Sequence, residues 1–111
     1  MGTGQAIDEI YYPREDIRRG FDWYNGTGLV LVADENISLV TFSIVFKRGD
    51  QTILTLSESS GTIVHSGTTS IRLLVNAALS ATLSTGLIRG DLMGVVSGYN
   101  RFMGTIETVI R

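Results

Sequence analysis

Short apolar runs separated by glycine-rich or polar turns make up the chain from Phe21 to its end. In residues 39–47 and 69–75, polar and apolar residues alternate, which gives a β-strand one apolar face. The residues predicted to share these faces are Phe42, Ile44 and Phe46 in the first run and Ile71, Leu73 and Val75 in the second. This period of two favours strands over helices throughout the region.

The other apolar runs complete an all-β prediction. Further strands are predicted at residues 21–24, 29–33, 52–56, 63–64, 87–96 and 101–110, with one helical turn within residues 76–83. In the last strand, one face is predicted to carry Phe102, Gly104, Ile106, Thr108 and Ile110. Residues 48–51 and 97–100 are predicted hairpin connections, because glycine supplies the positive φ that such turns often require. About seven strands at this turn spacing predict an antiparallel β-sandwich.

The first 20 residues have a different composition. Charged side chains crowd this stretch, and Pro13, the single proline, favours extended backbone before it. The run after Pro13 is too short to form a stable helix alone. We therefore predict two parts, an extended N-terminal arm at residues 1–20 and a sandwich domain at residues 21–111. A frayed terminus is the alternative interpretation of the arm.

Aromatic and basic residues in and beside the arm are the candidate interface residues. Aromatic side chains and arginine are enriched in protein–protein interfaces. The candidates are Tyr11, Tyr12, Arg14, Arg18, Arg19, Trp23 and Tyr24. The aromatic members would serve equally well in a sandwich core, so both interpretations stay open at this point.

Composition and charge limit the kinds of partner. The 111 residues carry a formal net charge of −2, so we expect no nucleic-acid binding. The sequence has no cysteine, which excludes disulfides and thiolate chemistry. The first residues lack a basic start followed by an apolar run, and no stretch is long and apolar enough to span a bilayer, so we expect neither a secretory signal nor a membrane partner.

Candidate chemistry is sparse. His65 is the only histidine, and no serine sits in a nucleophile-elbow motif, so catalysis by His65 is disfavoured. One histidine without cysteine does not form a zinc site, and we predict no cofactor, no small-molecule substrate and no enzymatic activity.

Arg89 and Asp91 share a strand face, and Glu107 lies on the facing strand, which predicts a surface ion pair. Residues 48–50 have the sequence Arg-Gly-Asp, the tripeptide that cell-surface adhesion receptors recognise. Glycine and aspartate are common at hairpin tips for conformational reasons, so the tripeptide alone does not indicate adhesion.

Several motifs in a fixed order resemble the immunoglobulin-like domain of small bacteriophage tail and baseplate proteins. The first half carries RGFD at residues 19–22, DENISLVT at 34–41, FSIVFKR at 42–48 and ILTL at 53–56. The second half carries SGTTSIRL at 66–73, AALSATLSTG at 77–86, GDL at 90–92 and FMGTIETV at 102–109. Together they cover about four fifths of the chain.

This resemblance implies a seven-stranded immunoglobulin-like sandwich without catalytic residues. It implies a virion structural protein of a tailed phage, in the tail, baseplate, neck or capsid surface. Its partners are expected to be other phage structural proteins and further copies of itself, a homo-oligomer made in the host cytoplasm and located in the virion. The alternative is a recognition module that binds carbohydrate or protein through end loops of the sandwich, with residues 25–28 and 97–100 as candidates.

Overall fold

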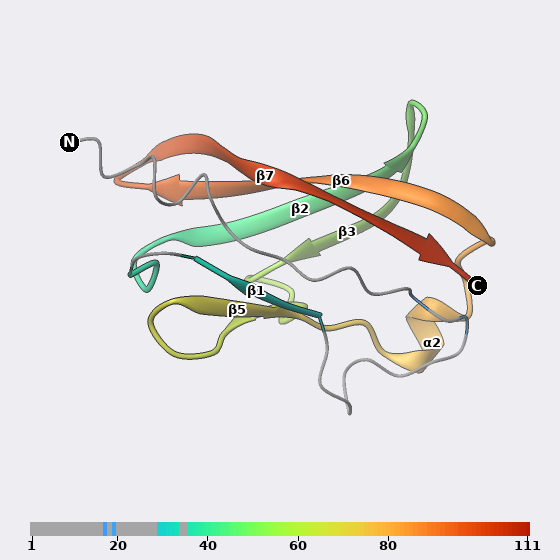
Figure 1. The fold of residues 1–111 in the computed structure, drawn as a ribbon, viewed down its shortest axis with the longest axis horizontal. Coiled ribbons are helices and arrows are strands. Elements are labelled where there is room, and N and C mark those ends of the chain that lie inside the picture. The colour runs from blue at the N-terminus through green and yellow to red at the C-terminus, as the bar shows by residue number, and fades with distance from the viewer. Residues whose placement is uncertain (1–16, 18, 20–28, 34–35) are drawn as a thin grey trace.

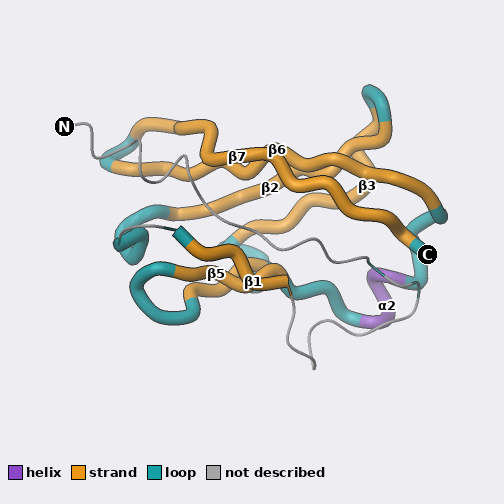
Figure 2. Tube along the Cα trace, viewed as in Figure 1, coloured by secondary structure: helices purple, strands orange, loops and turns teal. Residues whose placement is uncertain are grey.

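A computed structural model describes Ile17, Arg19, residues 29–33 and residues 36–111 (Figures 1 and 2). Strands dominate this part of the chain, with one short helix. The strands are β1 (Leu29–Val32), β2 (Thr41–Arg48), β3 (Gln51–Ser57), β4 (Ile63–His65), β5 (Ser70–Leu73), β6 (Gly86–Val96) and β7 (Tyr99–Ile110), and the helix is α2 (Ala77–Ser80).

The strands form two antiparallel sheets that share one hydrophobic core. One sheet has the order β1-β5-β4 and the other β3-β2-β6-β7. Figure 1 shows the three-stranded sheet lying against the four-stranded one. Buried side chains of both sheets belong to a single cluster, for example Leu31 and Ile71 from one and Ile44 and Ile106 from the other. The prediction of an all-β fold is thereby confirmed.

The alternation of polar and apolar residues predicted the buried faces of two strands correctly. On β2 the predicted apolar face is fully buried, and so is that of the segment containing β5. The outward residues of β2 are exposed or half-buried. Because side chains in a strand alternate between faces, this pattern fixes which side of each sheet meets the core.

The connections follow the predicted turn chemistry. Gly49 has a φ of 62° in the tight turn between β2 and β3. The β6–β7 hairpin turns at Ser97 and Gly98, whose φ values are 51° and 84°, so its loop is shorter than the predicted residues 97–100. Asn76 caps α2 because its Oδ1 accepts the Leu79 N–H at 2.7 Å, which confirms the predicted helical turn.

A β-bulge in β7 contradicts one predicted strand face. The register changes between Leu92, which lies opposite Gly104, and Met93, which lies opposite Phe102. The extra residue, Met103, is fully buried, whereas Phe102 is 52% exposed. A one-residue shift moves every side chain beyond it to the other face. Phe102 therefore faces solvent, while Ile106, Thr108 and Ile110 are buried as predicted.

Two residues of the predicted arm lie against the end of β7. Ile17 forms an isolated parallel bridge with Ile110 and is 1% exposed within the core cluster. Arg19 follows it and is exposed. The predicted strand at residues 21–24 lies outside the described residues, and the division at residue 20 stays a prediction.

Candidate interaction surface

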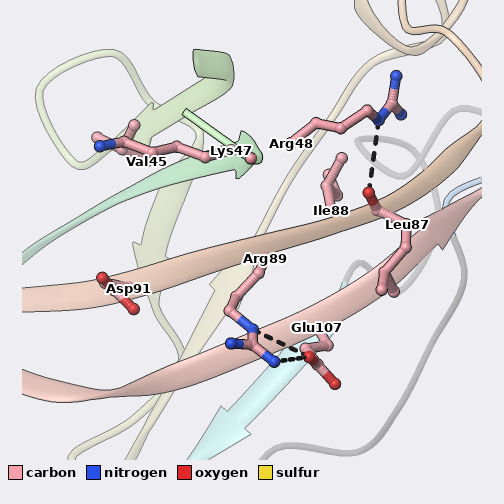
Figure 3. Close-up of a pocket in the computed structure, with 9 residues that line it drawn as sticks. Val45, Lys47, Arg48, Leu87, Ile88, Arg89, Asp91 and Glu107 are labelled. Atoms are coloured by element: carbon pink, nitrogen blue, oxygen red, sulfur yellow. Dashed lines mark hydrogen bonds and ion pairs between the residues drawn. The ribbon is translucent and has the colours of Figure 1, made fainter. Parts of the chain in front are cut away.

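The outer face of the four-stranded sheet carries a shallow hollow of about 390 Å³ (Figure 3). Outward residues of three neighbouring strands, β2, β6 and β7, line most of it. The lining residues are Val45, Lys47, Arg48, Gly49, Leu87, Ile88, Arg89, Asp91 and Glu107. Three of these side chains are basic and two are acidic.

Arg89 and Glu107 form the predicted cross-strand ion pair on the exposed side of the hollow. They are direct partners in the β6–β7 register. Arg89 Nε donates to Glu107 Oε2 at 2.9 Å, and a second guanidinium nitrogen of Arg89 contacts the same oxygen. The hydrogen bond and the negative charge of Glu107 raise the pKa of Arg89 above its ordinary value. Beside this pair, Thr105 Oγ1 donates to Asp91 Oδ1 at 3.2 Å.

Arg48 is held by the segment that leads into β6. Its guanidinium donates to Ser84 Oγ at 2.5 Å and to the Ser84 carbonyl at 2.9 Å. A longer contact of 3.4 Å joins Arg48 Nε to the Leu87 carbonyl (Figure 3). A Cβ at Gly86 would lie 3.3 Å from this guanidinium, so the glycine lets the two segments approach closely. These contacts position the chain, and the hollow brings together no nucleophile with a general base.

Exposed apolar side chains gather at the hairpin end of the same sheet. Val95 and Phe102 face outward near the end of β6 and the beginning of β7, and Tyr99 lies beside the turn. Tyr99 pairs with Val96, whose side chain points to the opposite face from that of Val95, so we call Val95 and Phe102 alone the hairpin-end surface. Leu39, which is 89% exposed, lies in the loop that leads into β2 at this end of the sheet, where Thr41 pairs with Val95.

His65 forms a contact between the two sheets. It ends β4, and its Nε2 lies 3.0 Å from the Val40 carbonyl and 3.2 Å from Glu58 Oε2. The same carboxylate oxygen accepts the Phe42 N–H at 2.6 Å. Both neighbours of Nε2 are acceptors, so this nitrogen carries the hydrogen. His65 therefore lies at the end of an edge strand, where its ring links the two sheets.

The described part of the chain holds neither a cluster of metal-ligating residues nor a membrane-spanning helix. Within it, no three histidine, cysteine, aspartate or glutamate side chains come together as a metal site would require. Its helical segment is far too short to cross a bilayer.

The structure places one of the predicted interface residues. The backbone N–H of Arg19 donates to the Arg111 carbonyl at 2.8 Å, and Arg19 lines a shallow hollow with Ala81, Thr85 and Arg111. The other six predicted residues lie outside the described residues: Tyr11, Tyr12, Arg14, Arg18, Trp23 and Tyr24.

Sequence reasoning missed Phe102 as a surface residue, whereas Tyr99 falls within the predicted connection at residues 97–100. The uninterrupted alternation assigned Phe102 to the buried face, and the bulge that reverses it gives only a weak signal, a glycine inside a strand at Gly104.

Comparison with known proteins gives no relative. No family model matches the chain, and neither the curated proteins nor the solved structures contain a significant match.

Proposed function

We propose that this protein is a virion structural protein of a tailed bacteriophage that acts by protein–protein assembly. It would belong to the tail, baseplate, neck or capsid surface, and its partners would be other phage structural proteins and further copies of itself. The observation that carries the proposal is the hairpin-end surface. Phe102 is 52% exposed and Val95 is 38% exposed on the outer face at one end of the sheet. Neighbouring exposed apolar side chains of this kind are typical of protein contacts.

The strand order supports an immunoglobulin-like type of sandwich. In that fold, strands B, E and D lie in one sheet and strands C, F and G in the other, with an added strand C′ beside C in the larger variants. The sheet β1-β5-β4 corresponds to B-E-D. The sheet β3-β2-β6-β7 corresponds to C′-C-F-G. This agreement in order and pairing favours the resemblance drawn from the sequence motifs.

A matched pair of substitutions tests the assembly proposal. Phe102 and Leu87 are 52% and 53% exposed on the outer face of the same sheet, at opposite ends of the β6–β7 ladder. Phe102→Ser is expected to lower incorporation of the chain into phage particles at least about tenfold, while Leu87→Ser leaves it near wild type. Both variants are expected to unfold at nearly the wild-type temperature, because neither side chain is buried. Equal incorporation of both variants would contradict the role of the hairpin-end surface.

Tyr99 also favours the second candidate function, a recognition module. Tyrosine at a loop tip offers a rigid contact surface with a polar end, as in antibody loops. A glycan array and a pull-down with the isolated chain test this function. A saccharide bound specifically and lost in Tyr99→Ser would favour recognition over assembly.

A further inference from the structure

The segment around Ile17 occupies a defined slot beside the end of β7. The Ile17 N–H donates to the Val109 carbonyl at 2.9 Å, and the Ile17 carbonyl accepts the Arg111 N–H at 2.8 Å. The Arg19 N–H continues the pairing to the Arg111 carbonyl at 2.8 Å. The side chain of Ile17 is 1% exposed. The slot therefore consists of backbone groups of Val109 in β7 and of Arg111 just after it, together with one apolar position in the core.

This contact has the form of strand addition to a sheet edge. β7 is the last strand in its sheet, and its outer edge offers N–H and C=O groups to an extended segment. In strand addition, main-chain hydrogen bonds hold the segment and a buried side chain fixes its position. Ile17 provides both features. Backbone groups and an apolar position are the same in every copy, so the slot does not distinguish a copy's own segment from a neighbour's.

The segment is joined to the domain by a short stretch. Nine residues, 20–28, connect Arg19 to β1, and three of them are glycines. In dilute solution, this tether keeps a copy's own segment at a high effective concentration beside its slot. Inside an assembly, neighbouring copies are held close together, so a neighbour's segment also reaches a high effective concentration beside the slot. Exchange of an identical element is a low-cost route to linked copies.

We propose that the slot at the end of β7 accepts the Ile17 segment of a neighbouring copy, so that exchanged segments link copies in the assembly. This inference rests on the proposed assembly function and names the connection between copies. The occupant is a second copy of this chain, bound through its own residue 17.

Cross-linking between differently labelled copies of the full chain tests the exchange. Arg19 and Thr85 line the same shallow hollow, and the chain contains no cysteine. An Arg19→Cys chain and a size-tagged Thr85→Cys chain are unfolded together, refolded at high concentration and treated with a short bis-maleimide. The chain with both substitutions, cross-linked within itself at low concentration, provides the reference yield.

We expect a heterodimer whose yield rises with protein concentration. Adding Ile17→Asp to the Arg19→Cys chain is expected to lower this yield at least about tenfold, whereas Ile17→Val retains it. A heterodimer yield that is unchanged by Ile17→Asp would overturn the proposal, and so would the absence of heterodimer at every concentration. Incorporation into particles is a separate measurement, so assembly without exchange and exchange without assembly are both recognisable outcomes.

Discussion

Replacing Glu58 by alanine removes a side chain that continues the β2–β3 ladder. The last backbone pair of this ladder joins Ser43 to Ser57. One residue further, the Glu58 N–H donates to the Phe42 carbonyl at 3.3 Å, and the Glu58 carboxylate accepts the Phe42 N–H at 2.6 Å. The carboxylate thus stands where a strand carbonyl would, at the beginning of β2.

The expected cost follows from the group that loses its partner. Phe42 is 1% exposed, and without Glu58 its N–H has no acceptor among the described residues. An unsatisfied buried donor costs about 1–3 kcal/mol. The Glu58 side chain is 23% exposed, which lets water reach part of the site and lowers our expectation to about 1–2 kcal/mol. In the alanine variant, His65 keeps its hydrogen bond to the Val40 carbonyl, so losing its contact with Glu58 costs less stability than the loss at Phe42.

Urea unfolding of Glu58→Ala and Glu58→Gln measures this cost. In a thermal scan, Glu58→Ala is correspondingly expected to lower Tm by about 5–10 °C for a domain of this size. Glu58→Gln keeps an oxygen acceptor and is expected to lose less than half as much free energy of unfolding. A Glu58→Ala chain as stable as wild type, or a glutamine variant as damaged as the alanine variant, would refute the assigned role of the carboxylate.

Two further substitutions test the packing of the core, and a third tests the exposed ion pair. Gly90→Ala places a Cβ 2.8 Å from Phe46 Cδ1 and 2.9 Å from Ile44 Cδ1, and it is expected to lower the free energy of unfolding by about 1–3 kcal/mol in a urea titration. Ile17→Ala is expected to cost about 2–4 kcal/mol by the same titration, and a neutral result would contradict the burial of this side chain. Arg89→Ala removes an exposed ion pair and is expected to leave Tm close to wild type, so a large drop in a thermal scan would contradict the surface assignment.

The sequence predicts local features of this fold well. Alternation identifies the buried face of β2, because Phe42, Ile44 and Phe46 stand two residues apart. The ion pair between Arg89 and Glu107 follows from residues on matching faces of a predicted hairpin. Each prediction depends on neighbouring residues or on one short connection.

Features that depend on distant contacts escape such patterns. The extra residue at Met103 reverses the face of Phe102, and the core that favours this bulge is assembled from several strands. The contact of His65 with Glu58 and Val40 joins two sheets, which no local pattern relates. Ile17 pairs with Ile110, more than 90 residues away in the sequence, and its own neighbours in the sequence are charged.

Quantitative mass spectrometry of gradient-purified phage particles tests the assembly function most directly. Under the proposed function the chain is encoded by a tailed phage, whose particles are the sample, and an isotope-labelled peptide from residues 73–89 serves as the standard. We predict the chain at a constant number of copies per particle, in proportion to the major capsid protein through repeated gradients. Its presence in the lysate and absence from the purified particles would contradict the account.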